Sequence, residues 1–86
     1  MSEKGVRSFE EWRSWALSKL TELAAPSEKE EVRSIASLLL ADLERLDLGK
    51  LPRFLIRLYA AATVDERFLD IAPSSREVPA WLYGLK

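Results

Sequence analysis

This chain of 86 residues contains no cysteine and no histidine. Without cysteine it can form no disulfide, and it has no thiolate to act as a nucleophile or to bind a soft metal ion. Without histidine it lacks the side chain that most often transfers protons near neutral pH and most often binds metals. We therefore expect a binding protein rather than an enzyme, with no cofactor and no bound metal.

Asparagine and glutamine are absent as well, while 31% of the residues are charged. Proteins of thermophiles tend to have few of these heat-labile amides and many charged residues. A short chain, or a genome rich in GC, produces the same composition without any selection for heat stability. Both explanations of the composition stand at this point.

Long apolar runs and an excess of charge of one sign are also missing. No run approaches the roughly 18 apolar residues that cross a membrane, and Met1 to Gly5 contain no apolar signal region. Thirteen basic residues face fourteen acidic ones and are scattered among them, which disfavours a protein that binds nucleic acid on its own. We expect a cytoplasmic protein without membrane association.

The length of the chain fits a single domain, whose core is thin enough that a partner's surface could matter for burial. Residues 1–7 are largely polar and include a glycine, so they are predicted to form a flexible N-terminal tail. Residues 8–86 are predicted to form one helical domain.

The first predicted helix begins at Ser8 and ends before Pro26. Ser8 and Glu11 have the spacing of a capping box, in which each side chain accepts a hydrogen bond from the other residue's backbone N–H. Pro26 ends the helix because a proline has no N–H to donate and its ring clashes with the preceding turn. Spacings of three and four residues define one apolar stripe, formed by Phe9, Trp12, Ala16, Leu20 and Leu23.

The second predicted helix follows the same pattern. Ser27 and Glu30 have the spacing of a second capping box, and Gly49 is expected to end the helix in a left-handed conformation. The apolar positions between them cover roughly 200° of the helix surface, more than one buried face requires. These positions are Val32, Ile35, Ala36, Leu38, Leu39, Leu40, Leu43 and Leu46.

The third predicted helix starts at Leu51-Pro52, since proline suits the first turn of a helix. Thr63 and Glu66 have the spacing of a third capping box, which would open a fourth helix over about residues 64–72. One long helix is the alternative. Residues 73–75 are predicted to interrupt the helical structure, and a short helical turn is predicted to begin at Pro79.

These elements predict an all-α fold, a compact bundle of three to four short helices with an ordered apolar C-terminal segment. The chain contains no alternating strand pattern flanked by hairpin turns. The short connections between the first three helices favour antiparallel neighbours.

Apolar side chains point in nearly every direction around the third helix. From Phe54 to Val64, only Arg57 and Thr63 are polar. A helix that is apolar on all sides is normally buried at a centre or pressed between two surfaces. A central position within the bundle is one interpretation, and coverage by another chain is the one we favour. The predicted partner-binding residues on this helix are Phe54, Leu55, Ile56 and Tyr59.

Two further candidates for partner binding contain tryptophan. Trp15 lies about 60° from the apolar stripe of its helix and has charged neighbours, as tryptophans at binding hot spots often do. The last nine residues, which include Trp81, Leu82 and Tyr83, are too apolar to stay free in water. They either dock on the first and third helices or form a linear motif for a partner's groove, and we favour docking.

The string Val78-Pro79-x-Trp81-Leu82-x-x-Leu85-Lys86 resembles a segment of subunits of the GINS replication complex. The resemblance covers nine residues and does not continue along the chain, so it assigns no family. A nucleic-acid-associated accessory factor of replication or transcription is our second functional hypothesis. Its expected contacts are Arg53, Arg57, Arg67 and Arg76.

Four acidic residues could take part in chemistry or in ion pairs. Asp42 falls inside the apolar arc of the second helix, and Arg53 or Arg57 is predicted to form a structural ion pair with it. Asp65, Glu66 and Asp70 could hold a hard cation, which makes a carboxylate-metal enzyme the third hypothesis. An ordinary solvated acidic face is the alternative.

The principal hypothesis is a small helical protein–protein interaction module. It would be an adaptor or accessory subunit of a larger complex, or a homodimer.

Overall fold

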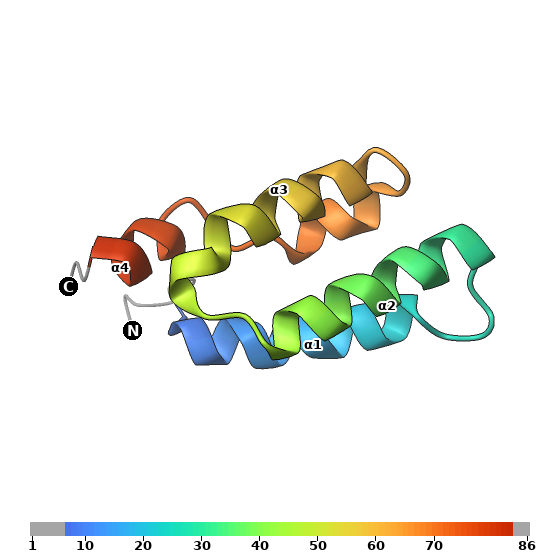
Figure 1. Ribbon diagram of the computed structural model, residues 1–86, viewed down its shortest axis with the longest axis horizontal. Coiled ribbons are helices and arrows are strands. Elements are labelled where there is room, and N and C mark those ends of the chain that lie inside the picture. Colours follow the sequence, from blue (N-terminus) through green and yellow to red (C-terminus); the bar gives the residue numbers. More distant parts are fainter. Residues whose placement is uncertain (1–6, 84–86) are drawn as a thin grey trace.

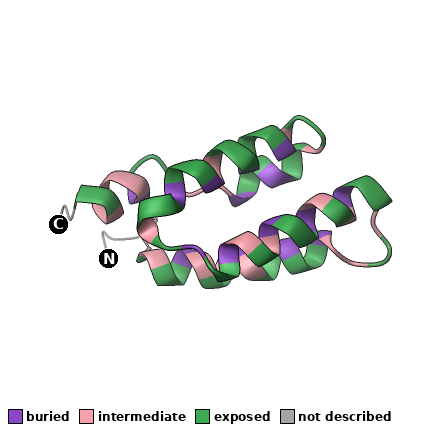
Figure 2. Cartoon of the chain, viewed as in Figure 1, coloured by how far each residue is buried: buried purple, intermediate pink, exposed green. Residues whose placement is uncertain are grey.

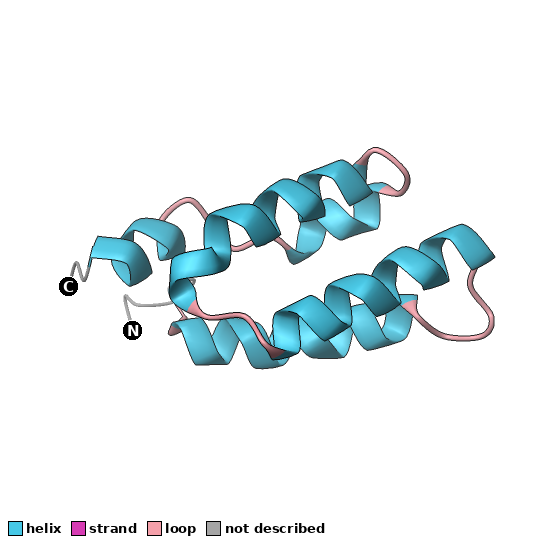
Figure 3. Ribbon diagram, in the orientation of Figure 1, coloured by secondary structure: helices cyan, strands magenta, loops and turns pink. Residues whose placement is uncertain are grey.

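The computed structural model describes residues 7–83, and within that range the chain is helical without any strand (Figure 3). The all-α prediction is confirmed. In chain order the elements are α1 (Phe9–Leu23), α2 (Glu30–Glu44), the 3₁₀ helix η1 (Leu48–Lys50), α3 (Leu51–Ala62), the 3₁₀ helix η2 (Glu66–Ile71) and α4 (Glu77–Tyr83). Residues 1–6 of the predicted tail lie outside the described range.

The helices form two layers (Figure 1). α1 and α2 run antiparallel and make one layer, while α3 and the returning η2 make the other. α4 lies at the end of the molecule where α1 and α3 begin. The buried residues lie largely on the inner sides of these elements (Figure 2). They are Trp12, Ala16, Leu20, Leu23, Val32, Ala36, Leu39, Leu43, Leu46, Leu51, Phe54, Leu58, Ala61, Phe68 and Ile71.

The start of α1 confirms the predicted capping box. Ser8 Oγ accepts a hydrogen bond from the Glu11 backbone N–H (3.1 Å), and Glu11 Oε1 accepts one from the Ser8 N–H (2.8 Å). Trp12 is fully buried, and its indole N–H donates to the Ile71 carbonyl oxygen (2.9 Å). This bond ties the first helix to the end of η2, across the two layers.

The predicted boundaries of α2 are wrong at both ends. Lys29 precedes the helix without any side-chain cap, because the Glu28 N–H closes a turn onto the Ala25 carbonyl and holds Ser27 inside that turn. At the other end α2 stops at Glu44, where the Arg13 guanidinium donates to the Leu43 carbonyl oxygen (3.1 Å).

The loop after α2 explains why Gly49 does not act as its C-cap. Gly49 lies inside η1 and does not have the left-handed conformation predicted for it. Asp47 caps this short helix by accepting a hydrogen bond from the Lys50 N–H (3.2 Å). The chain therefore turns from α2 into α3 through a capped 3₁₀ turn rather than a glycine-ended helix.

α3 starts at Leu51, as predicted, and ends at Ala62. The capping box expected at Thr63 is wrong, because the Thr63 hydroxyl donates back to the Ala60 carbonyl oxygen (2.6 Å). Asp65 caps instead, by accepting from the Arg67 N–H (2.9 Å). The segment that follows is η2, so neither the fourth α-helix at this place nor the single long helix forms.

Candidate functional site

The structure separates the two sides of α3 that the sequence could not distinguish. Phe54 lies in the core with 3% of its surface exposed, and Leu55 is half-buried against that core. Ile56 and Tyr59 lie on the opposite side, with 68% and 48% exposed. Phe54 was expected at a partner surface, but its direction on the helix makes it part of the interior.

The outer side of α3 includes a strip of uncharged residues. Positions 52, 56, 59, 60 and 63 are all exposed, and they are proline, isoleucine, tyrosine, alanine and threonine. Their spacing places them on one side of an α-helix, opposite the buried residues Leu51, Phe54, Leu58 and Ala61. Arg53 and Arg57, which are also exposed, lie along one edge of this side, so the uncharged strip is bordered by two cations.

A groove runs between α2 and α3 beside this uncharged strip. It has a volume of about 440 Å³, and we call it the α2–α3 groove. Leu39 and Ala61 are buried within it, and the exposed residues Leu38 and Val64 belong to its walls. Its lining residues are Ile35, Leu38, Leu39, Asp42, Arg57, Ala60, Ala61 and Val64. These residues form the α2–α3 face, and Ile56 lies one helical turn before Ala60 at its edge. Tyr59 projects roughly 140–160° away from Val64 and Arg57 around α3, so this predicted partner-binding residue does not belong to the face.

The predicted ion pair of Asp42 lies in this groove. Arg57 Nη1 donates to Asp42 Oδ2 at 2.6 Å, so Arg57 is the partner rather than Arg53. The side chains of Arg57 and Asp42 are 63% and 39% exposed. The pair joins α2 to α3 as expected, but at the surface, where water weakens it.

Trp15 is half-buried and lies between two cations. The Arg7 guanidinium carbon is 4.7 Å from the centre of a Trp15 ring, and Lys19 Nζ is 5.9 Å away. A hollow of about 350 Å³ beside it has charged residues of both signs in its lining. The Arg7 contact occupies part of the indole, so Trp15 is a weaker candidate for partner binding than the α2–α3 face.

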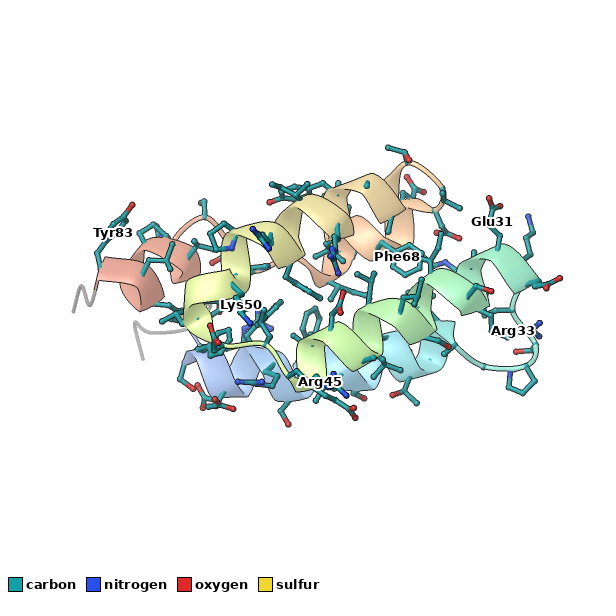
Figure 4. The ribbon with its side chains drawn as sticks, in the orientation of Figure 1. Glu31, Arg33, Arg45, Lys50, Phe68 and Tyr83 are labelled. Carbon is teal, nitrogen blue, oxygen red and sulfur yellow. The ribbon has the colours of Figure 1, made fainter. Side chains whose placement is uncertain are left out.

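The C-terminal segment docks on the fold as far as the structure describes it. The Trp81 ring lies 5.4 Å from Phe9 and 5.5 Å from Trp12, centre to centre, and its N–H donates to the Arg7 carbonyl oxygen (2.8 Å). Leu82 is exposed, and Tyr83 points away from the fold with 74% exposed (Figure 4). Leu85 lies outside residues 7–83.

Sequence reasoning missed the buried carboxylate that fixes this end of the molecule. Glu77 is fully buried and accepts hydrogen bonds from the Arg7 backbone N–H (2.7 Å), Nε (2.7 Å) and Nη2 (2.9 Å). It also accepts one from the Ser74 N–H (2.9 Å), while the Glu77 N–H donates to Ser74 Oγ (3.2 Å). Arg7 is therefore bound to the fold rather than part of a loose tail.

The reciprocal bonds between Ser74 and Glu77 are a capping box. The signal was present in the sequence as a serine three residues before a glutamate, the same spacing as Ser8 and Glu11. The helix begins at Glu77, two residues before Pro79, which occupies its first turn. Burial alone would raise the pKa of Glu77, but the hydrogen bonds from Arg7 and Ser74 and the charge of Arg7 lower it to about 2.

The acidic residues near η2 are held by Arg67. Its guanidinium binds both oxygens of Glu28 (2.9 Å each) and donates to Asp65 from Nε (3.0 Å) and Nη2 (2.8 Å). These bonds from the Arg67 side chain and backbone lower the pKa of Asp65 to about 2. Within residues 7–83, no cluster of three acidic side chains is arranged to hold a metal ion, and Glu66 and Asp70 are both exposed.

The four arginines of the nucleic-acid hypothesis do not form one surface. Arg57 is paired with Asp42, and Arg67 with Glu28 and Asp65. Arg53 lines a hollow of about 250 Å³ together with Arg45, Lys50 and Arg57, at the end of the α2–α3 groove near the α2–α3 turn. Arg76 precedes α4, in another part of the chain.

Across residues 7–83, no helix combines the length and the hydropathy needed to cross a membrane. Comparison with known proteins adds no assignment: no family model, no curated protein and no solved structure matches this chain.

Proposed function

We propose that this protein is a cytoplasmic protein–protein interaction module, an adaptor or accessory subunit, that binds another chain through the α2–α3 face. One observation carries the proposal. Two of the seven large apolar residues that stand exposed within residues 7–83, Leu38 and Val64, line this one groove, and a third, Ile56, lies one helical turn before Ala60 at its edge. Apolar patches of this kind on a small protein mark interaction sites more often than chance exposure.

The shape of the face suits a helix from the partner. The α2–α3 groove is apolar along its length except for the Asp42–Arg57 pair, and the small side chains of Ala60 and Ala61 leave room between the two helices. An amphipathic helix places apolar side chains at intervals of three and four residues into a groove of this type. The ion pair in the groove offers a polar contact that can select among such helices.

The nucleic-acid hypothesis has less support. Two of its four arginines are already bound to carboxylates, and the remaining two, Arg53 and Arg76, lie in different parts of the chain. Its remaining support is the hollow that Arg53 shares with Arg45, Lys50 and Arg57, because contact with a phosphate backbone needs several cations along one surface. A binding isotherm with duplex and single-stranded oligonucleotides at two salt concentrations tests this hypothesis directly.

The absence of cysteine allows a clean test of the proposed face. A Leu38→Cys variant carries a single thiol in the α2–α3 groove, and a Ser37→Cys variant carries one on the neighbouring, exposed position of α2. Adjacent positions on a helix point about 100° apart, so the Ser37 thiol lies away from the groove. Both variants are introduced into extract of the source cells and treated with a short bis-maleimide.

Crosslinking of the Leu38→Cys variant to a defined second chain, with little crosslinking of the Ser37→Cys control, supports the proposal. The mass of the adduct identifies that chain, whether it is a second copy or a different protein. Equal crosslinking of both variants, or none of either, contradicts the proposal, because a covered face must differ from the uncovered flank of the same helix.

A further inference from the structure

The charged residues at the two ends of α2 lie in line with its most exposed apolar residue. Glu31, Leu38 and Arg45 are spaced seven residues apart, which is about 10 Å per interval along a helix. Leu38 is 69% exposed, and the two charged residues are exposed as well. Figure 4 shows Glu31 in the first turn of α2 and Arg45 just past its last turn. Leu38 is thus the midpoint between two opposite charges.

Neither charged residue forms an ion pair with another residue of the described range 7–83. Arg7, Arg13, Arg57 and Arg67, in contrast, all form one. Arg33, the nearest arginine in sequence to Glu31, donates to the Pro26 carbonyl oxygen instead (3.2 Å).

The charges around the α2–α3 groove are distributed in the same direction as these two residues, with basic side chains near Arg45 and an acid at the other end. At the end near the α2–α3 turn, the hollow of about 250 Å³ is lined by Arg45, Lys50, Arg53 and Arg57, with Asp42 as its single acid. At the opposite end, Glu31 in the first turn of α2 precedes the groove-lining residue Ile35 by one helical turn. One end of the face is therefore basic, and an acid stands at the other.

We propose that the chain bound to the α2–α3 face is a second copy of this protein, antiparallel to the first about a two-fold axis at Leu38. This inference rests on the proposed function and names the partner. In such an isologous pairing, α2 lies along α2 of the partner, and Leu38 meets its own copy. Because the two intervals of seven residues are equal, Arg45 then faces the partner's Glu31, and Glu31 faces the partner's Arg45.

The charge pattern also disfavours the parallel arrangement. Two copies side by side in the same direction bring Arg45 to Arg45 and Glu31 to Glu31, and like charges placed opposite one another are repulsive. The antiparallel arrangement, in contrast to the parallel one, joins the basic end of each face to the acidic end of the other while covering the apolar centre. Ala60 and Val64 on α3 add to that centre, since they line the same groove.

A charge-exchange experiment tests this arrangement. Sedimentation equilibrium of the purified protein is expected to show a dimer of twice the 9.8 kDa chain mass. The Glu31→Arg variant and the Arg45→Glu variant each replace two attractive contacts per dimer with repulsive ones, so the dissociation constant should rise about tenfold. The variant with both exchanges restores opposite charges and should return to within about threefold of the original value.

Folding stability cannot produce that rescue. Glu31 lies at the positive end of the α2 dipole and Arg45 at the negative end, so each exchange weakens the folded chain and both together weaken it most. The double variant is thus expected to have the lowest melting temperature of the four proteins and yet to recover its association. Two results would overturn the antiparallel arrangement. In the first, the double variant, which has the lowest melting temperature, also has the weakest association. In the second, the single variants associate as strongly as the original protein.

The single-thiol variants give an independent measurement. At the two-fold axis the two Leu38 side chains are neighbours, so the purified Leu38→Cys variant should form an intermolecular disulfide on mild oxidation, while the Ser37→Cys variant should not. A purified chain that stays monomeric up to roughly millimolar concentration overturns the inference. In that case the crosslinking experiment in cell extract decides the proposed function. A different protein attached to the Leu38→Cys variant supports the proposed function, and the absence of any attached protein contradicts it.

Discussion

Two of the Arg–carboxylate pairs that join distant parts of this chain, Arg7–Glu77 and Arg57–Asp42, lie in opposite surroundings. Glu77, at the end where Arg7 meets α4, is fully buried and accepts four hydrogen bonds. Asp42, in the α2–α3 groove, accepts one bond from Arg57, and both side chains are substantially exposed.

The difference teaches what each region contributes. At the Arg7–Glu77 end, Trp15 and Trp81 contact Arg7, and Glu77 is fully buried, so the loss of one partner leaves buried polar groups without a hydrogen-bond partner. In the groove, water replaces a lost partner. The closed end therefore maintains the fold, while the α2–α3 face keeps groups that a second chain can still bind.

The largest effect is expected at Glu77. Glu77→Ala leaves the Arg7 guanidinium and the Ser74 N–H without their acceptor, and a broken buried pair costs about 3–5 kcal/mol. Because the Arg7 side chain is 32% exposed and can regain water, we expect the free energy of unfolding to fall by about 2–4 kcal/mol. Urea unfolding followed by tryptophan fluorescence measures this, and a loss below about 1 kcal/mol would contradict the comparison.

The contact between Arg7 and Glu77 should also make the folded protein less stable at low pH. Folding lowers the pKa of Glu77 from its ordinary value of 4.5 to about 2, so its contribution to stability is complete above pH 4.5 and disappears as the pH falls towards 2. Asp65, whose pKa is also lowered to about 2, adds to the loss in the same range. Unfolding free energies measured from pH 6 to 2 should fall steeply, and Glu77→Gln should make the slope shallower.

The packing of Trp81 ranks next. Trp81→Ala removes a half-buried indole that contacts Phe9 and Trp12 and donates to the Arg7 carbonyl, so we expect a loss of about 2–3 kcal/mol. Tyr83→Ala is the matched control, because that ring is two residues further along α4 and largely exposed. Its loss should stay within about 0.5 kcal/mol, and equal losses for both variants would mean that α4 does not dock through Trp81.

The capping boxes show how far the sequence alone could lead. The same pattern, serine or threonine three residues before glutamate, occurs at Ser8, Ser27, Thr63 and Ser74. It forms at Ser8 and Ser74 and fails at Ser27 and Thr63. Both failures lie in the turns whose carboxylates, Glu28 and Asp65, are bound by Arg67. Local spacing cannot reveal such a contact between residues 39 positions apart.

The apolar positions were more informative than the caps. The stripe of α1 was predicted correctly, because a core helix needs one buried side at a fixed period. Around α3 the apolar residues cover both sides, and periodicity cannot distinguish Phe54 inside from Ile56 outside until the neighbouring helices are placed. The same limit applies to Asp42: its pairing with Arg57 was predictable, but its exposure was not.

Asp42 offers the direct contrast with Glu77. Asp42→Ala breaks an ion pair of similar length, but at the surface, where such pairs contribute about 0.2–1 kcal/mol. We expect a loss of stability in that range, reduced further by added salt. A loss as large as that of Glu77→Ala would show that the groove is part of the structural core of the fold rather than an open surface.

The smallest effect on stability is expected at Ile56. Its side chain projects from the outer side of α3 with most of its surface in water, so Ile56→Ser removes almost no buried contact. The free energy of unfolding should change by less than about 0.5–1 kcal/mol, including the modest difference in helix propensity. Leu58→Ser on the same helix is the matched comparison, because Leu58 is fully buried and its replacement leaves a cavity and a polar group in the core.

Ile56→Ser, which has the smallest expected effect on folding stability, should have a large effect on association with another chain. If another chain covers the α2–α3 face, Ile56→Ser weakens binding while leaving the melting temperature nearly unchanged, because the lost apolar contact exists only in the complex. Crosslinking from the Leu38 position in cell extract, repeated with the Ile56→Ser exchange added, measures this loss. A strong drop in melting temperature with undiminished crosslinking would mean that the exposed side of α3 serves the fold itself, and the distinction between a closed structural end and an open binding face would then be wrong.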